Sequence, residues 1–286
     1  MKRRDLLLSS CALMGVSRAS PAQEPATVVY PRHLPAQDSQ VNYFVELMQL
    51  ALQQGPRRYE LRPTRSEMVQ SRALLELASP RPGLDVFWTM NDAQREGALL
   101  PIRIPLERGL IGWRLLLVRR ADAGAYAQLS LAELAQRQAG QMGDWPDTRI
   151  LRANGLPVQT SSHYQGLFEM LAQGRIDYFP RSVLEIDAEL QAYGDGRLAV
   201  ASGLMLHYPA ALYLYVRPSR PQLAEDLALG LEALVASGTL ERLARRQFGA
   251  LLARHQVAQR RVLHLQNPLL GEHTPLQRKA LWWQPP

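Results

Sequence analysis

Apolar positions recur along the first ninety residues in two alternating spacings. From residue 41 to residue 53 they fall three or four positions apart, which predicts an amphipathic helix that stops at Gly55 and Pro56. Short β-branched and aromatic runs between polar segments predict strands instead. The expected elements are strands at 27–30, 59–62 and 85–88 and helices at 41–53 and 67–78. This order is typical of a parallel sheet covered by helices.

One helix-turn-strand phrase occurs twice. Residues 71–78 form an apolar helical stretch that breaks at 80–83 and enters a short apolar run at 84–88. Residues 166–172 form a similar stretch that breaks at Gly174 and enters a run at 175–179. Each phrase predicts a helix, a tight turn and a buried strand. Two copies of one α/β unit predict two similar lobes with a cleft between them.

Two long apolar runs, at 110–119 and 208–216, are predicted to be strands that carry the chain from lobe 1 to lobe 2 and back, forming a hinge. The other expected elements are helices at 131–137, 147–154, 164–173, 183–192, 223–236 and 240–248 and strands at 139–142, 158–160, 176–179, 198–201 and 261–265. The fold class is therefore α/β, with two lobes and two hinge strands. The expected domains are a signal segment at 1–22, lobe 1 (first part) at 23–112, lobe 2 at 113–210, the return to lobe 1 at 211–249 and a C-terminal extension at 250–286.

Composition and charge remove several classes of function. The 286 residues are enough for two domains with sizeable cores. The net charge is +7, but the basic residues are scattered rather than striped, so nucleic-acid binding is not expected. Cys11 is the only cysteine and the six histidines show no metal-ligand spacing, so neither a metal nor a cofactor is expected.

The first 22 residues read as an export signal. Lys2, Arg3 and Arg4 precede a short apolar run at 6–16, and small residues follow at 20–22. We therefore expect a soluble periplasmic protein. Arg3 and Arg4 leave open whether export uses the general secretory or the twin-arginine route. Lipid anchoring at Cys11 is not expected, because the apolar core continues past it.

Four phrases in order resemble one family. They are 84–86 followed by Arg95, the glycine turn at 140–143, the phrase at 171–177, and 238–240 leading to 247–249. Over residues 26–249 the chain resembles the type II periplasmic solute-binding proteins, family 3, whose best-known members bind polar amino acids for ABC transporters. The resemblance implies that Arg95 holds a ligand carboxylate, since a guanidinium binds a carboxylate through two hydrogen bonds.

In open α/β sheets, ligands bind beyond the carboxyl ends of the strands. With the resemblance, this rule selects ten candidate ligand-binding residues: Arg95, Tyr30, Trp88, Thr89, Asn91, Asp144, Trp145, Tyr178, Arg181 and Ser182. Asp144 has an alternative role as the cap of the following helix. Trp145 either stacks on a ligand or belongs to the core.

The chain departs from the family pattern at two positions. The family threonine three residues before Arg95 is Asp92, and the family carboxylate of lobe 2, which pairs with an ammonium group, is Ser182 preceded by Arg181. A serine hydroxyl does not replace a buried countercharge. We therefore expect a small anionic or aromatic solute rather than a standard α-amino acid.

Enzymatic readings are weaker. Ser161, Ser162 and His163 lack a Gly-x-Ser-x-Gly elbow, and Ser161 or Ser162 is expected to cap a helix. The carboxylates at 185, 187 and 189 are expected on a solvated helix face. The sequence thus predicts a monomeric, non-enzymatic binding protein that delivers a small-molecule ligand to an ABC permease. The alternatives are a transport-defunct sensory or interaction protein working with a membrane sensor, and a small-molecule lyase using Asp144 and Arg95.

Overall fold

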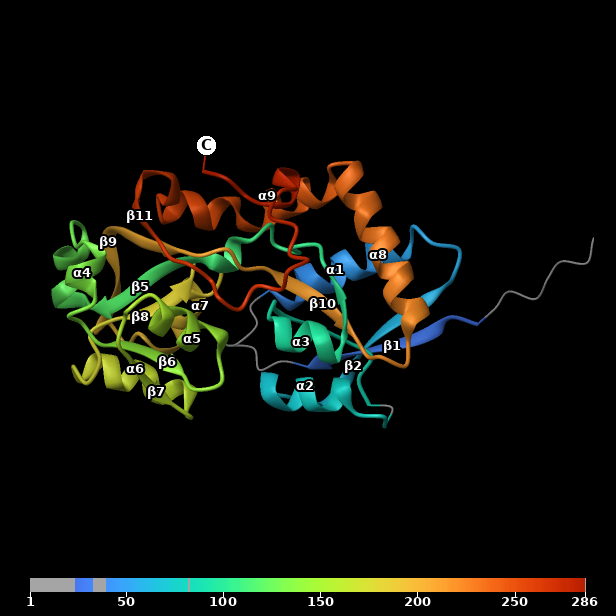
Figure 1. Ribbon diagram of the computed structural model, residues 1–286, viewed down its shortest axis with the longest axis horizontal. Coiled ribbons are helices and arrows are strands. Elements are labelled where there is room, and N and C mark those ends of the chain that lie inside the picture. The colour runs from blue at the N-terminus through green and yellow to red at the C-terminus, as the bar shows by residue number, and fades with distance from the viewer. Residues whose placement is uncertain (1–23, 33–39, 82, 286) are drawn as a thin grey trace, which may run out of the picture.

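The computed structural model describes residues 24–32, 40–81 and 83–285. The predicted signal segment, with Cys11, lies outside the described residues. The described chain forms two α/β lobes that are joined along one side (Figure 1). Every helix within these described ranges is too short or too polar to span a lipid bilayer.

Lobe 1 is made of two small sheets with helices around them. Its elements are β1 (Ala26–Arg32), α1 (Val41–Leu52), β2 (Tyr59–Glu67), α2 (Gln70–Ala78), β3 (Val86–Met90), α3 (Ala93–Ala98), β4 (Leu100–Ile102), β10 (Leu212–Val216), α8 (Pro221–Ala236) and α9 (Thr239–Arg254). β1 and β2 pair in parallel, whereas β10 lies antiparallel between β3 and β4. α1 packs on α8 at Gly230, where a Cβ atom would lie 2.0 Å from the carbonyl oxygen of Ala51. Glycine is therefore required for this close helix contact.

Lobe 2 is built around an antiparallel sheet. Its elements are β5 (Trp113–Arg119), the 3-10 helix η2 (Arg120–Tyr126), α4 (Leu131–Leu134), β6 (Ala139–Met142), α5 (Pro146–Ala153), β7 (Val158–Ser161), α6 (Tyr164–Ala172), β8 (Phe179–Ser182), α7 (Ile186–Tyr193) and β9 (Leu198–His207). β5 lies between β8 and β9, and β6 pairs in parallel with β7.

The repeated phrase forms one unit in each lobe, since α2 leads into β3 and α6 leads into β8. The extent predicted for the second strand, 176–179, is wrong. β8 runs from Phe179 to Ser182, and Tyr178 makes only an isolated bridge with Ala139. Pro180 reads as the end of a strand in the sequence. It is accommodated here because β8 is the edge strand of its sheet, where a missing N–H donor is tolerated.

The structure refines the two predicted crossings between the lobes. Residues 110–112 form the 3-10 helix η1 (Leu110–Gly112) ahead of β5, and β10 begins only at Leu212. The chain therefore crosses in short connections that end at Gly112 and Ala211. These connections touch each other, because a Cβ atom on Gly112 would lie 2.1 Å from the carbonyl oxygen of Tyr208. The Tyr208 N–H also donates to the carbonyl of Gly112 at 3.2 Å.

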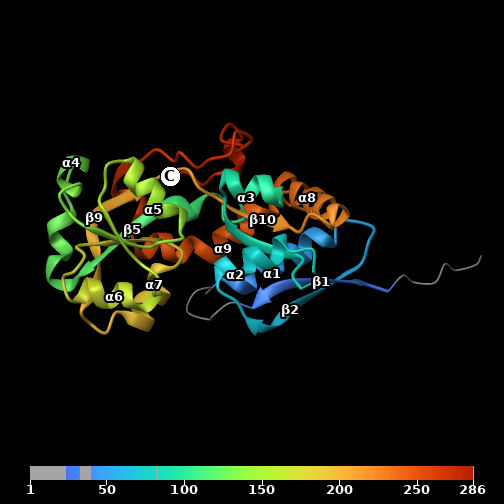
Figure 2. The same ribbon diagram turned by 60° about the horizontal axis from the view of Figure 1, so that its bottom comes forward.

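The chain beyond α9 stays against the body of the protein. Its elements are η3 (Val257–Gln259), β11 (Arg261–His264) and η4 (Lys279–Leu281). The strand predicted at 261–265 is confirmed as β11, which adds in parallel to the edge strand β9 of lobe 2. Figures 1 and 2 show this segment running over the side of the molecule where the lobes are joined.

Candidate ligand-binding site

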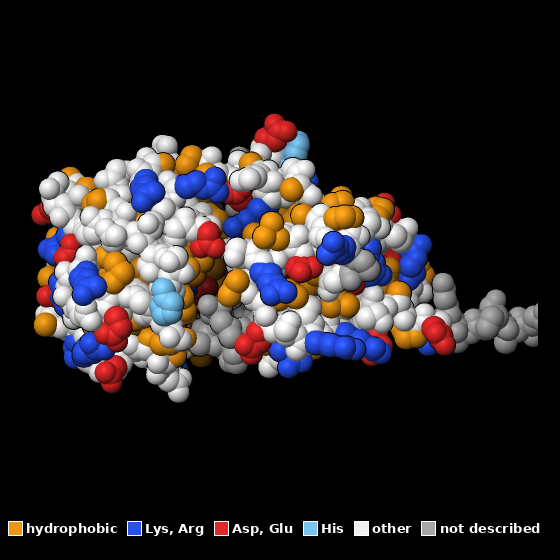
Figure 3. All heavy atoms as spheres, turned by 90° about the horizontal axis from the view of Figure 1, so that it is seen from below, with side chains coloured by type: hydrophobic (Ala, Val, Ile, Leu, Met, Phe, Trp, Pro, Cys, Tyr) orange, Lys and Arg blue, Asp and Glu red, His pale blue; other side chains and the backbone are white. Residues whose placement is uncertain are grey.

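A cavity of about 770 Å³ lies between the lobes, and Figure 3 shows the surface hollowed there. Lobe 1 lines it with β3 and the start of α2. Lobe 2 lines it with the loop before α5, the start of α6 and the segment after β8. Ile111 from the outward crossing, Arg114 from the start of β5 and Leu212 from the start of β10 complete this part of the lining. The inter-lobe cleft expected from the repeat is therefore present.

The lobe 1 wall is organised around Thr89, which lies in the fully buried strand β3. Thr89 Oγ1 donates to Gln70 Oε1 at 2.9 Å and accepts from Arg95 Nη1 at 2.9 Å. The same Arg95 nitrogen donates to the carbonyl of Met90 at 2.8 Å. Burial lowers the pKa of Arg95, while Asp92 raises it. Arg95 thus holds lobe 1 together and is not among the described residues that line the cavity.

The lobe 2 wall contains a buried arginine with two acidic partners. Arg181 is 4% exposed, and its Nε donates to the two oxygens of Glu189 at 2.9 and 2.7 Å. Its guanidinium carbon lies 4.5 Å from the ring centroid of Trp145. Burial lowers the pKa of Arg181, but Glu185 and Glu189 override that effect and raise it. Arg181 is therefore a charged group whose charge is already compensated.

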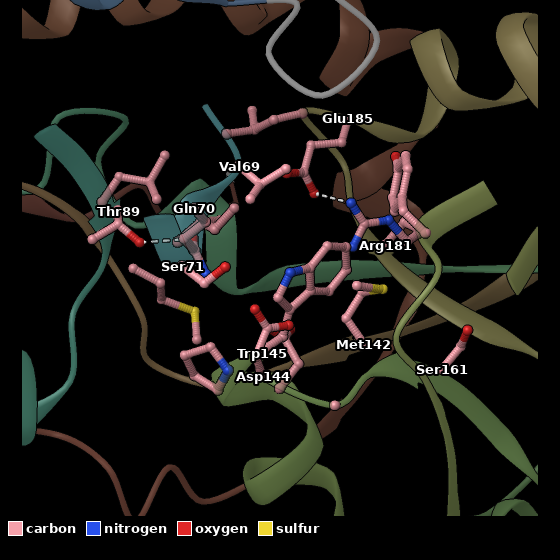
Figure 4. A pocket seen from close by; sticks show the side chains of 18 of the residues that line it. Val69, Gln70, Ser71, Thr89, Met142, Asp144, Trp145, Ser161, Arg181 and Glu185 are labelled. Carbon is pink, nitrogen blue, oxygen red and sulfur yellow. Dashed lines mark hydrogen bonds and ion pairs between the residues drawn. The ribbon is translucent and has the colours of Figure 1, made fainter. Parts of the chain in front are cut away.

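Glu185 lies at the inner edge of this network and faces the cavity (Figure 4). Its side chain is 28% exposed, and its Oε2 is 3.0 Å from Arg181 Nη2 and 3.8 Å from Arg114 Nη1. Burial raises the pKa of Glu185, Arg181 lowers it, and the neighbouring Glu189 raises it again. An additional cation in the cavity would therefore stabilise the ionised form of this carboxyl group.

Arg114 is compensated in the same way. Arg114 lies near the start of β5, next to the hinge. Its Nη2 is 2.8 Å from Asp147 Oδ1. The hydroxyl of Tyr208 donates to the same carboxylate, and the guanidinium lies 5.4 Å from the Tyr208 ring centroid. Burial lowers the pKa of Arg114, while Asp147 raises it, and the net direction is upward.

The alternative role of Asp144, as the cap of the following helix, is not observed. Trp145 occupies the N-cap position of α5, followed by Pro146, and its side chain makes no cap hydrogen bond. Asp144 is exposed and lines the cavity, where Figure 4 shows it beside Trp145. The Trp145 ring also packs 5.9 Å from that of Tyr164. Trp145 therefore belongs both to the core of lobe 2 and to the cavity wall.

The structure divides the ten predicted ligand-binding residues into two groups. The residues that line the cavity are Trp88, Thr89, Asp144, Trp145 and Arg181. The residues outside its described lining are Tyr30, Asn91, Arg95, Tyr178 and Ser182.

The second group is used inside the fold. Asn91 exchanges hydrogen bonds with Ala211 at the hinge, at 2.8 and 3.0 Å. Tyr178 is fully buried beside Tyr126, and the Ser182 hydroxyl accepts from the N–H of Leu184. Tyr30 packs behind Trp88, with ring centroids 6.0 Å apart. These five side chains therefore have partners within the fold instead of a place in the described cavity lining.

Several cavity residues were not predicted, namely Gln70, Ser71, Arg114, Asp147, Tyr164 and Glu185. The expected solvated face at 185–189 is wrong, since Glu189 is 1% exposed and bound to Arg181 and Tyr164. The spacing offered a signal, because residues 185 and 189 lie four and eight positions after Arg181. The expected serine cap is also wrong, as His163 Nδ1 accepts from the N–H of Gly166.

These contacts change the expectation of an anionic solute, which relied on Arg95 and Arg181. Arg95 is engaged with Thr89 and Met90, and Arg181 with two carboxylates. Among the charged residues that line the cavity, Arg114 and Arg181 face Asp144, Asp147 and Glu185. Glu189, which binds Arg181 and is not in the described lining, adds a fourth negative charge. The described wall therefore offers no uncompensated cation to an anion.

Comparisons with known proteins gave no match among protein-family models and none among curated proteins. Solved structures do match. An ancestral arginine-binding protein bound to arginine has a TM-score of 0.57 at 14% identity, covering 79% of this chain and 100% of that one. The periplasmic VFT2 domain of BvgS from Bordetella pertussis has a TM-score of 0.57 at 19% identity, covering 78% and 92%.

A third structure is the probable amino-acid ABC transporter extracellular-binding protein YtmK from Bacillus subtilis. It has a TM-score of 0.57 at 16% identity and covers 79% of this chain and 100% of that one. Identities this low carry information about the fold alone. Together with the two lobes and the cleft, they show that this chain has the two-lobed fold of the type II periplasmic binding proteins.

Proposed function

We propose that this protein is an exported solute-binding protein whose cleft holds a small amino-acid-like solute through a cationic group. The observation that carries the proposal is the negative wall of lobe 2. Glu185 faces the cavity beside an arginine that already binds Glu189, and Asp144 has no ion pair with a described residue. The names of two similar structures, one an arginine-binding protein and one a probable amino-acid transporter component, support this ligand class.

The proposed contacts follow from the chemistry of the two walls. A ligand ammonium or guanidinium group between Asp144 and Glu185 supplies positive charge to the described lobe 2 wall, where carboxylates outnumber arginines. This charge favours the ionised form of both carboxylates. A guanidinium also stacks on an indole face, and Trp145 presents its ring to the cavity. Gln70 and Thr89 provide neutral hydrogen-bonding groups on the opposite wall.

A ligand screen tests the charge. Thermal-shift and calorimetric titrations should show binding of L-arginine and L-lysine at pH 7, and no binding of L-glutamate or benzoate. The lobe 2 carboxylates repel an added anion and attract an added cation. Binding of the two anions alone would contradict this proposal and restore the anionic or aromatic solute expected from the sequence.

A substitution tests the residue that carries the proposal. Glu185→Gln keeps the shape of the side chain and removes its charge, and should weaken L-arginine binding by at least about 30-fold. Glu169→Gln is the matched control, because Glu169 is also in lobe 2 and pairs with an arginine, but on the exposed surface. Equal affinities of the two variants would exclude Glu185 from the site.

We further propose that residues 1–22 direct export and that the mature protein is a monomer. It delivers the solute to an ABC permease without changing it chemically. A sensory or interaction role is the second candidate. It is favoured by the length of the chain, since the three solved structures are covered to 92–100% but account for only 78–79% of it. Neighbouring genes for a permease and an ATPase favour the first role, and those for a sensor kinase or cyclase favour the second.

A further inference from the structure

The segment after α9, residues 255–285, binds lobe 2 first; we call it the clasp. β11 pairs with β9 in register from Leu204 to His207. Arg260 Nη1 donates to the carbonyls of Ala201 and Leu204 at 2.7 and 3.1 Å. Further on, Asn154 exchanges two hydrogen bonds with the backbone of residue 266, at 2.7 and 2.9 Å.

The clasp then returns to lobe 1. The carbonyl of Leu269 accepts from the N–H of Ala93, at the start of α3, at 3.0 Å. Arg278 binds both oxygens of Glu232 on α8, at 2.7 and 2.8 Å. Leu281 is fully buried in the same hydrophobic cluster as α8. The clasp is therefore anchored by backbone pairing on one lobe, and by an ion pair and apolar burial on the other.

Between and beyond these anchors, the clasp packs on both crossings. Asn267 Nδ2 donates to the carbonyl of Pro209 at 2.8 Å, which lies in the return crossing. The Trp283 N–H donates to the carbonyl of Arg108 at 2.6 Å, which lies in the outward crossing. The Trp282 ring fits against Gly109, whose φ is +77° and where a Cβ atom would lie 2.4 Å from the ring. Trp283 also packs edge-on against Trp113, with centroids 5.1 Å apart.

Rotation of two lobes about a hinge is absorbed by backbone dihedrals in the few connecting residues. Here those residues lie at 108–112 and 208–211, and the clasp covers and hydrogen-bonds both segments. The chain also passes between the lobes two further times, from α9 to β11 and from β11 to residue 269. We propose that the clasp stiffens the hinge and narrows the range of lobe opening. This holds whether or not the cleft takes the ligand proposed above.

The test measures lobe opening in the absence of ligand. Spin labels are attached at Leu75→Cys in lobe 1 and Gln173→Cys in lobe 2, with Cys11→Ser in the full chain. Both label sites are exposed. Electron-spin distance measurements should give a narrow distribution in the parent. In the double variant Trp282→Ala/Trp283→Ala the width should increase at least about twofold, because the hinge segments lose their cover.

Two further variants keep the test decisive. The double variant Arg278→Ala/Asn154→Ala removes one polar anchor of the clasp on each lobe. Because both side chains are exposed or half-exposed, this variant should fold even if the tryptophan variant does not. Leu276→Ala changes a side chain of the clasp that is 43% exposed and should leave the width unchanged. Hydrogen exchange at 261–264 reports release of the clasp. An unchanged width in a folded tryptophan variant, or in the anchor variant once that protection is lost, would overturn the proposal.

Discussion

The two walls of the cleft use their arginines in opposite ways. In lobe 1, Arg95 donates to Thr89 and to the carbonyl of Met90 and is not among the described residues that line the cavity. In lobe 2, Arg181 stays at the cavity but carries two carboxylates with it. Lobe 1 therefore presents a mostly neutral surface, and lobe 2 presents a negative one.

The difference shows that the charge of a site follows from partners rather than from residue types. Counting arginines near the strand ends suggests a site for anions. Once each arginine is paired with its carboxylates, the net charge of the site is negative. A guanidinium that already has ion-pair partners attracts a ligand anion only weakly. Variants of Arg181 and Arg95 test this contrast between the two walls, and a third variant tests the pH dependence of lobe 2.

Replacing the lobe 2 arginine should have the largest effect. Arg181→Met leaves Glu189 buried without its cation, and should lower the free energy of unfolding by about 3–5 kcal/mol. Urea unfolding followed by circular dichroism measures the loss. Arg197→Met is the control, because Arg197 pairs with Glu169 on the surface of the same lobe and should change stability little. Similar losses in the two variants would refute a buried network in lobe 2.

The edge of lobe 2 should make stability depend on pH. His207 lies beside His264 and stacks on Trp113, and burial followed by repulsion from His264 lowers its pKa from 6.5 to about 4. Between these two values the unfolded chain binds more protons than the folded one, so stability falls as pH falls. The full effect is up to about 3 kcal/mol.

His207→Gln should flatten this part of the pH dependence. The measurement is the free energy of unfolding at several pH values between 7 and 4 for the parent and the variant. The difference between the two free energies should be constant above the unfolded pKa, change as pH falls from 6.5 towards 4, and level off below the folded pKa. Parallel curves for the two proteins would place the titrating group elsewhere.

Replacing the lobe 1 arginine should have the smallest effect of the three. Arg95→Ala removes two hydrogen bonds within lobe 1 and should cost about 1–2 kcal/mol of stability. Because the guanidinium is outside the cavity lining, L-arginine affinity should change by less than about threefold. The resemblance to the solute-binding family predicts instead that Arg95 holds the ligand carboxylate. Loss of binding by a folded Arg95→Ala protein would support that role and break the contrast between the walls.

The fold was largely predictable because its main elements follow hydrophobic period and turn chemistry. The strand at 139–142 has the predicted bounds, and the helix at 41–53 differs by one residue. The helix α3 and strand β4 were not predicted, because six and three residues are too short to establish a period. The run at 208–216 was predicted as one strand, since its composition does not reveal that Tyr208 and Gly112 must touch.

The site was less predictable than the fold. Strand ends correctly indicated Thr89, Asp144 and Arg181 as cavity residues. They did not indicate Glu185. Its position depends on the connection from β8 to α7 and on its ion pairs with Arg181 and Arg114. They also gave no sign that Arg95 is satisfied by lobe 1 itself. Ion pairing between distant segments is a property of the tertiary structure, and one sequence contains only weak signals of it.

The insertion of β10 between β3 and β4 also governs the order in which the chain can fold. Strands β5 to β9 of lobe 2 are continuous in sequence, so they can pair as soon as they have left the ribosome or the export channel. The central strand of a lobe 1 sheet arrives only afterwards, and the tryptophans that cover the hinge come at the very end of the chain. Until then the edges of β3 and β4 lack their partner, and this late closure is the interval in which the nascent protein is most exposed to aggregation.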